Sequence, residues 1–159
     1  MVFTPKWLLR HKAATSKASD FTSGTFQPVI GDTTVDPAKV TKVALTSGKL
    51  YYELLAQREK SGRDDVALVR LERLYPFPAE ELAAELTRYG AQAELVWAQD
   101  EPTNMGPWPY LTLKLAEDPQ VLGGRSLRRV SRTANSSPAT GSHNAHDREL
   151  EEILHQIFG

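Results

Sequence analysis

The sequence predicts an α/β fold in which a mostly parallel sheet lies between two layers of helices. Three observations support this prediction. Short apolar runs alternate with stretches of helical periodicity from Lys42 onward. The connections between them are short, which favours neighbouring strands joined by helices. The composition, 40% hydrophobic and 25% charged, is that of a soluble globular domain.

The first 40 residues differ from the rest because they carry many small polar residues and few long aliphatic ones. Gly24, Gly31 and Pro37 interrupt the segment, which we interpret as a loose arm. One short strand is expected at Phe26–Ile30. Pro28 cannot donate a backbone hydrogen bond, so this strand should lie at an edge of the sheet.

The regular part begins with a strand at 43–46, followed by a helix that carries Leu50, Leu54 and Leu55 at helical spacing. A second strand is expected at 66–71. The next helix should start near Ala79 and place Leu82, Leu86 and Tyr89 on one face. Gly90 is suited to the position that follows the end of this helix.

The second half continues the alternation. A strand is expected at 94–99, a loop at 100–104 and a helix at about 107–116. The last strand is expected at 127–131, and the Ser/Thr/Pro/Gly-rich stretch that follows it should be a loop. The final helix, about 144–158, has an apolar stripe. That stripe is formed by Leu150, Ile153, Leu154, Ile157 and Phe158.

Composition excludes several functional classes. Nineteen basic and 20 acidic residues give a net charge of -1, which argues against nucleic-acid binding and a polybasic membrane anchor. No apolar run approaches the roughly 18 residues of a membrane span. The absence of cysteine excludes disulfides and cysteine-ligated metals. This composition is consistent with the cytoplasm, where we expect the protein.

Ligands of open α/β sheets bind beyond the carboxyl ends of the strands. Ser47, Gly48 and Lys49 follow the first strand of the series and form a possible anion site at a helix N-terminus. The complete phosphate-loop pattern is absent, so the alternative is that Ser47 caps the helix. A stand-alone module that binds an anionic ligand there remains a second functional hypothesis. A hydrolase is disfavoured because no G-x-S-x-G motif is present.

Other polar residues gather after the later strands. Asp100 and Glu101 are adjacent carboxylates at a strand end, where a general base could stand. The residue chemistry favours the alternative, a helix entry with Asn104 as the cap. His143 and His146 have a spacing that metal ligands use, without an evident third ligand. The five arginines of the C-terminal third should be divided between two faces because strand residues alternate. These are Arg125, Arg128, Arg129, Arg132 and Arg148.

Five motifs in this order and spacing resemble one family. The segments are Arg10–Ala14, Leu45–Tyr52, Val69–Pro78, Glu101–Trp108 and Ser137–His143. Together they are similar to the C-terminal region of the thiamine-diphosphate-dependent, decarboxylating component of 2-oxoglutarate dehydrogenase. The similarity covers the chain from about residue 2 to residue 159. It implies the transketolase C-terminal-like fold, a three-layer α/β/α domain with a mixed five-stranded sheet and one antiparallel edge strand.

The resemblance also implies a role. The family's enzyme decarboxylates 2-oxoglutarate on thiamine diphosphate and Mg²⁺ within the tricarboxylic acid cycle and passes a succinyl group to a lipoyl-bearing succinyltransferase. It is a homodimer with active sites between subunits. In that setting this chain would be a structural and dimerisation domain without catalytic, cofactor-binding or metal-binding residues. Its interface or positioning residues would be Glu101, Asn104, Trp108, Ser137 and His143.

The departures from the family pattern suggest a chain that depends on upstream domains. The family's Gly-Asp-Gly cofactor motif lies upstream, and Gly31-Asp32 is followed here by Thr33. Residues 2–6 resemble the last strand of the preceding pyrimidine-binding domain. We therefore expect residues 1–40 to form an N-terminal arm, which comprises that strand and the edge strand. The C-terminal-like domain would span 41–159, and the isolated chain would be inactive.

Some members of the family bind acetyl-CoA as an activator on this domain. The positions that match its binding residues carry other residues here, namely Thr25, Pro28, Arg73, Glu80 and Glu81. Glu80 and Glu81 would repel the CoA phosphates. We expect acetyl-CoA activation to be absent or to use other residues.

Overall fold

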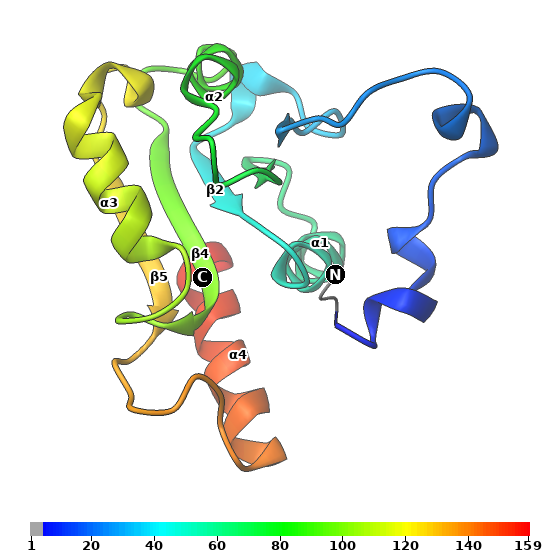
Figure 1. Cartoon of the computed structure of the whole chain (residues 1–159), viewed down its shortest axis with the longest axis vertical. Helices are drawn as coiled ribbons and strands as arrows, with labels where there is room; N and C mark the ends of the chain where they lie inside the picture. Colours follow the sequence, from blue (N-terminus) through cyan, green and yellow to red (C-terminus); the bar gives the residue numbers. More distant parts are fainter. Residues whose placement is uncertain (1–4) are drawn as a thin grey trace.

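A computed structural model describes residues 5–159 and shows a five-stranded mixed sheet between helices (Figure 1). The strands are β1 (Val29–Ile30), β2 (Lys42–Thr46), β3 (Val66–Leu71), β4 (Glu94–Pro102) and β5 (Leu127–Arg132). Their order across the sheet is β1-β3-β2-β4-β5. Strands β2 to β5 are parallel, whereas β1 pairs antiparallel with β3. The predicted three-layer fold with one antiparallel edge strand is confirmed.

Four helices form the outer layers: α1 (Leu50–Ser61), α2 (Ala79–Leu86), α3 (Trp108–Glu117) and α4 (His143–Phe158). Helices α1 and α4 pack on one face of the sheet, where their buried side chains join those of Ala44, Leu68 and Val96. Helices α2 and α3 cover the other face, around Val69 and Trp97. Because the strands are buried on both faces, they read as continuous apolar runs.

Some element boundaries differ from the sequence prediction. The edge strand contains only Val29–Ile30, and Phe26 is exposed instead. Strand β4 continues to Pro102, so the segment expected as a loop partly belongs to the sheet. Helix α2 ends at Leu86, and Thr87 in helical conformation follows it. The prediction that Gly90 follows the helix end is therefore wrong, and Gly90 does not adopt a positive φ.

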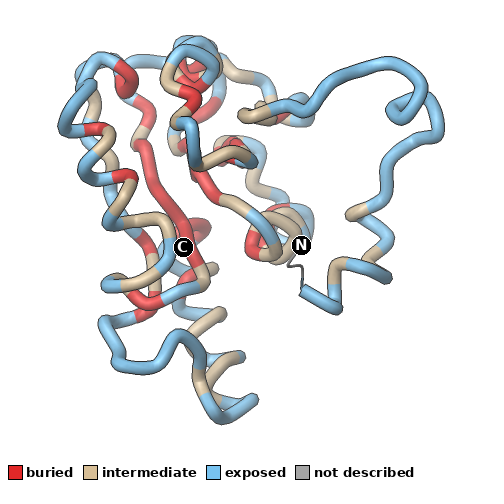
Figure 2. Tube along the Cα trace, viewed as in Figure 1, coloured by how far each residue is buried: buried red, intermediate tan, exposed pale blue. Residues whose placement is uncertain are grey.

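The N-terminal segment forms an arch beside the sheet. Three 3₁₀ turns, Leu8–Arg10, Lys12–Ala14 and Ala18–Phe21, lie along it. At its beginning Trp7 stacks on His11 with 3.9 Å between ring centroids, and His11 lies 5.4 Å from Tyr52 of α1. The middle of the arch stands away from the sheet and is exposed (Figures 1 and 2).

The strand of a preceding domain that we expected at residues 2–6 lies largely outside the described residues. Pro5 and Lys6, its two described members, are not in a strand. The proposed domain boundary between residues 40 and 41 stays a prediction.

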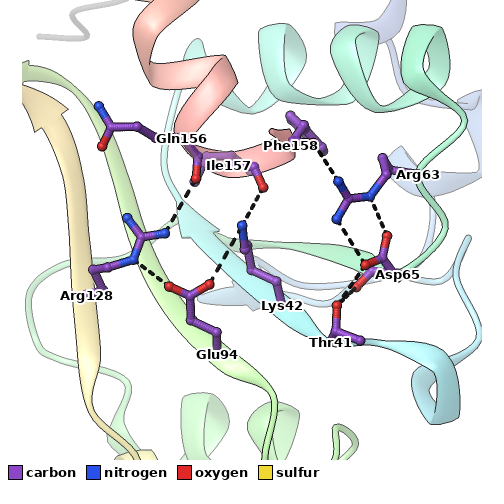
Figure 3. Close-up of polar contacts among 9 residues, drawn as sticks. All are labelled: Thr41, Lys42, Arg63, Asp65, Glu94, Arg128, Gln156, Ile157 and Phe158. Atoms are coloured by element: carbon purple, nitrogen blue, oxygen red, sulfur yellow. Dashed lines mark hydrogen bonds and ion pairs between the residues drawn. The ribbon is translucent and has the colours of Figure 1, made fainter.

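Three cations hold the last turn of α4 against the amino ends of the strands (Figure 3). The Lys42 ammonium donates to the Ile157 carbonyl at 2.7 Å, and Arg63 donates to the Phe158 carbonyl at 2.5 Å. Arg128 donates to the Gln156 carbonyl at 3.5 Å. These carbonyls have no partner within the helix, so the cations satisfy them and complement the helix dipole. The carboxylates of Glu94 and Asp65 balance the charge.

No helix formed by residues 5–159 combines the length and the apolarity needed to cross a bilayer.

Candidate functional site

A cavity of about 300 Å³ opens at the carboxyl ends of β2 and β4. The chain turns toward β3 after β2 and toward β5 after β4, so this is the point where the strand order reverses. Such a crevice is the usual ligand position in open α/β sheets. Its lining brings together Ser47, Gly48 and Lys49 from one loop with Gln99, Asp100 and Glu101 from the other. The two predicted sites therefore share one cavity.

Gln99 organises the loop on the β4 side of the cavity. Its buried amide donates to the carbonyls of Pro102 at 3.1 Å and Met105 at 2.7 Å. Its Oε1 accepts from the Trp97 indole at 2.9 Å and from the Trp108 backbone N–H at 3.0 Å. The Gln99 side chain thereby connects the core, the loop and the first residue of α3.

The Glu101 side chain packs against the same loop at Gly106, where only a residue without a side chain leaves room for it. Gly106 has φ of +66°, a conformation that L side chains disfavour. A Cβ atom there would lie 3.0 Å from Glu101 and 3.1 Å from the Gln99 amide nitrogen. Glycine is required at this position for both reasons. The Glu101 carboxylate is consequently exposed at the mouth of the cavity on a well-packed loop.

An irregularity in the pairing of β4 with β5 precedes this loop. Residues 95–98 pair with 127–130, and the next pair is Pro102 with Arg132. Three residues of β4 therefore stand opposite Ser131, and such bulges redirect side chains near functional sites.

Buried Arg132 then ties β4 to α4. Its guanidinium donates to Asp100 at 2.6 Å and bonds to the His146 ring nitrogen at 2.7 Å. It also pairs with Glu149 at 3.2 Å.

Asn104 joins this loop to the one after β5. Its amide donates to the Asn135 carbonyl at 2.9 Å, and its carbonyl accepts from the Asn135 N–H at 3.1 Å. The Ser137 N–H donates to the Asn135 side chain at 2.9 Å, so Ser137 belongs to the same unit. Asn104 does not cap α3, because Pro107 occupies the position before that helix. The interpretation of Asn104 as a cap is wrong.

Two predicted residues have different surroundings. The Trp108 ring is half-buried against the α2–α3 core and lies under the Arg129 guanidinium at 5.8 Å. His143 is the first residue of α4, is 89% exposed at its side chain and faces Asp147 at 3.8 Å. The structure links Asn104 with the segment that contains Ser137, and it places Glu101 at the end of β4 and Trp108 at the start of α3 on either side of Asn104. His143 stands apart.

The loop after β2 has a mixed electrostatic character. Lys49 occupies the position before α1 and no side chain caps the helix there, so the interpretation of Ser47 as the cap is wrong. The Lys49 ammonium pairs with Glu53 one turn later. Asp100 and Glu101 line the same cavity. An anion bound at Ser47–Lys49 would therefore find the Lys49 ammonium already paired with Glu53. It would also be repelled by the carboxylates of Asp100 and Glu101.

A family model described as 2-oxoglutarate dehydrogenase C-terminal matches residues 15–158. The chain belongs to this family. It is 47% identical over 165 residues to a multifunctional 2-oxoglutarate metabolism enzyme of Mycolicibacterium vanbaalenii. It is 48% identical over 160 residues to a 2-oxoglutarate dehydrogenase E1/E2 component of Corynebacterium glutamicum.

These matches cover nearly all of this chain and a small part of each relative. They include 100% and 99% of the chain, respectively, but 13% of each relative. A multifunctional 2-oxoglutarate metabolism enzyme of Mycobacterium sp. strain KMS gives the same picture, with 46% identity over 164 residues.

The described residues do not fit thiamine diphosphate with Mg²⁺. The one candidate aspartate of a Gly-Asp sequence, Asp32, is buried and accepts hydrogen bonds from Arg58, Thr34 and Leu68. Its carboxylate is therefore unavailable to a metal. Residues 5–159 contain no group of three His, Asp or Glu side chains arranged around a metal site.

Sequence reasoning missed three organising residues: Asp32, Gln99 and Arg132. The expectation that the arginines are divided is confirmed, because Arg132 is buried, Arg128 pairs with Glu94 and Arg129 covers Trp108. A polar residue at the end of an apolar strand was the available signal for Gln99 and Arg132. Nothing local to Asp32 indicated that its partners would lie 26 and 36 residues away.

Proposed function

We propose that this chain acts as the C-terminal domain of a 2-oxoglutarate dehydrogenase, within an enzyme that oxidatively decarboxylates 2-oxoglutarate in the tricarboxylic acid cycle. The observation that carries the proposal is the family match over residues 15–158, together with 47–48% identity to enzymes of 2-oxoglutarate metabolism. Thiamine diphosphate and Mg²⁺ would be held by other domains. The engagement of Asp32 by Arg58, Thr34 and Leu68 supports this part of the proposal.

The domain's role in this proposal is structural. The linked loops at the carboxyl ends of β4 and β5 form a rigid surface against which catalytic domains or a second subunit can be positioned. Four residues on and beside these loops are the proposed contacts: Glu101 at the end of β4, Asn104, Trp108 at the start of α3, and Ser137. His143 is exposed on α4 and would contribute from a separate place. Rigid polar loops on a buried scaffold suit such positioning.

The proposed partners are the upstream domains of the same enzyme, a second copy in a homodimer, and a lipoyl-bearing succinyltransferase. The E1/E2 name of the Corynebacterium glutamicum relative supports the last of these. A cytoplasmic location is proposed on the cysteine-free composition.

A chimera tests the proposal. The matching 160 residues of the Corynebacterium glutamicum protein are replaced by this chain, and 2-oxoglutarate-dependent CO₂ release is measured. We expect release at a rate within about tenfold of the parent. Asn104→Ala should reduce kcat further by loosening the two loops, whereas Asn144→Ala, at an exposed position of α4, should not. A folded chimera without activity would contradict the proposal.

A second candidate, anion binding at Ser47–Lys49, is favoured by one observation, the cavity that these residues line. Titration with inorganic phosphate tests it, with Lys49→Ala as the variant. Saturable heat at millimolar phosphate that Lys49→Ala abolishes would support this function. Equal heats for both proteins would exclude it.

A further inference from the structure

Four aromatic rings join the start of the arch, residues 5–28, to helix α1. Trp7 stacks on His11 with 3.9 Å between ring centroids, and His11 lies 5.4 Å from Tyr52. Tyr52 meets the neighbouring Tyr51 ring edge-on at 5.1 Å. Tilted and edge-on rings at such separations attract one another. These four rings, Trp7, His11, Tyr51 and Tyr52, form what we call the ring stack.

A cation lies against each end of the ring stack. The Arg70 guanidinium of β3 lies over the Tyr51 ring at 4.6 Å, and the Lys49 ammonium lies over the Trp7 ring at 5.9 Å. Such contacts are attractive because the face of an aromatic ring carries negative charge. Lys49 also pairs with Glu53 of α1. Contacts therefore run without interruption from β3 through α1 to Trp7 of the arch.

Stacking accounts for the position of the His11 ring. Its Nδ1 is buried and has no hydrogen-bond partner among residues 5–159. A phenyl ring would make the same ring contacts without a buried unsatisfied nitrogen. His11→Phe is therefore the conservative replacement, whereas His11→Ala removes the ring on which Trp7 stacks.

The ring stack lies beside the cavity at β2 and β4. Lys49 and Leu50 line that cavity from the start of α1, and Pro5 lines it from the arch. Pro5 precedes Trp7 by two residues, which span at most about 7 Å. The contacts that hold Trp7 on α1 therefore also hold Pro5 at the cavity.

Three of the five segments that resemble the 2-oxoglutarate dehydrogenase family meet at the ring stack. His11 belongs to Arg10–Ala14, Tyr52 to Leu45–Tyr52, and Arg70 to Val69–Pro78. The other two segments contain the contacts proposed above beside β4 and β5. The ring stack is thus a separate feature, and the proposed function has not yet given it a role.

We infer that the ring stack positions the catalytic domains of the proposed enzyme at this cavity, by holding the segment that joins them to this domain. The inference rests on the proposed function and adds positioning residues to it. The first hydrogen bond that ties the arch to the sheet joins the Pro28 carbonyl to the Glu72 N–H at 2.8 Å. If the ring stack opens, residues 7–27 become a free tether. The effective concentration of tethered domains falls with about the −3/2 power of tether length, so an open stack weakens their positioning.

Limited trypsin digestion of the chain measures whether the ring stack holds this segment. Arg10 and Lys12 flank His11, whereas Lys17 lies in the exposed middle of the arch. We expect His11→Ala to accelerate cleavage after Arg10 and Lys12 at least fivefold and to leave cleavage after Lys17 unchanged. Trp7→Ala, at a ring that is 45% exposed and lies outside the core, should have the same effect. Cleavage of both variants at the rate of the unmodified chain would overturn the inference.

The chimera described above measures positioning. We expect His11→Ala to lower kcat for CO₂ release at least threefold, and His11→Phe to keep the kcat of the unmodified chimera. His155→Ala, at an exposed histidine of α4, is the matched control and should not change kcat.

A flexible insertion separates positioning from a merely structural effect. About 40 Gly/Ser residues are inserted after Gly24, in the exposed middle of the arch, where loops tolerate insertions. The insertion should leave kcat unchanged while the ring stack is intact, because the tether is then closed. In the His11→Ala background it lengthens the free tether about threefold and should lower kcat about a further fivefold.

The outcomes distinguish this inference from the proposed function. A folded chimera that is inactive with the unmodified ring stack overturns the proposed function and, with it, the positioning. An active chimera overturns the positioning alone if His11→Ala keeps full kcat or if His11→Phe loses it. The same holds if the insertion has an equal effect in both backgrounds.

Discussion

The Asp32 carboxylate accepts a hydrogen bond from the backbone N–H of Leu68 at 2.9 Å. Strand β1 pairs with β3 only at Leu71 and Arg70, so the outer edge of β3 would be unpaired beyond that point. The Asp32 side chain takes the place of a further strand residue. It also forms a buried ion pair with Arg58 of α1 and thereby fixes the base of the arch to the sheet and to a helix.

Replacing Asp32 should strongly destabilise the domain. Asp32→Asn leaves the buried Arg58 guanidinium without a counter-charge, and breaking such a pair costs about 3–5 kcal/mol. Urea unfolding monitored by circular dichroism measures the change. Asp36→Asn is the control, because exposed Asp36 only caps a short turn through the Ala38 N–H. A loss below about 1 kcal/mol for Asp32→Asn would contradict this view of the pair.

Acid should destabilise the domain through Asp65. Hydrogen bonds from Arg63 and Thr41 lower the pKa of Asp65 to about 2, against a usual value of 3.8. A carboxyl with a lowered pKa contributes stability that is complete above the unfolded pKa and is lost as the pH falls toward 2.

We therefore expect Asp65→Asn to remove up to about 2 kcal/mol of stability at pH 7 and to flatten the decline between pH 4 and pH 2. Glu59→Gln, at an exposed position of α1, should leave the pH profile of unfolding unchanged. Parallel profiles for the wild type and Asp65→Asn would show that this carboxyl does not determine the acid sensitivity.

Asp32 should add to the same acid sensitivity. Burial raises the pKa of Asp32, but the hydrogen bonds from Arg58, Thr34 and Leu68 outweigh that effect and hold the pKa below its usual range. In the wild type its contribution is present near neutral pH and is lost on acidification. The stability difference between wild type and Asp32→Asn should therefore shrink as the pH falls below 4.

Alanine substitutions at Gly106 and Gly62 separate two causes of lost stability, the steric clash of the added Cβ atom and the strain of the left-handed backbone. Both have φ near +65°, but a Cβ atom at Gly62 meets nothing within 4 Å, whereas at Gly106 it meets Glu101 and Gln99. Gly62→Ala should cost about 1–2 kcal/mol from its backbone conformation alone. Gly106→Ala should cost about 1–3 kcal/mol more, as overpacked sites do, in chemical denaturation. Equal costs would argue against a tightly packed loop.

Gln99 should be essential to the loop after β4. Gln99→Met keeps the side-chain volume but removes the partner of five atoms. These are the Trp97 indole, the Trp108 N–H and the carbonyls of Glu101, Pro102 and Met105. We expect a loss of about 2–4 kcal/mol, since each buried unsatisfied group costs about 1–3 kcal/mol. Unfolding followed by tryptophan fluorescence measures it, with exposed Gln120→Met as the control. A variant as stable as the wild type would remove Gln99 from its proposed role.

Periodicity predicted the sheet, its helices and the edge strand, because buried parallel strands and amphipathic helices impose local patterns on the sequence. Periodicity did not predict the element boundaries that contacts between residues distant in sequence determine. Edge strand β1 stops at Ile30 because the Asp32 side chain replaces further pairing, and α2 ends four residues before Gly90. The loops that form the cavity were predicted, but their organiser Gln99 was not, because its five partner atoms belong to residues whose proximity only the fold creates.

The most direct test of the central claim measures CO₂ released from 1-labelled 2-oxoglutarate by the isolated chain, with thiamine diphosphate, Mg²⁺ and an electron acceptor present. Because the proposed function places the cofactor site in other domains, we predict release at the uncatalysed rate, while a relative's full-length enzyme is active under the same conditions. Release above that rate by the 159-residue chain would contradict the view that it supports a reaction carried out by other domains.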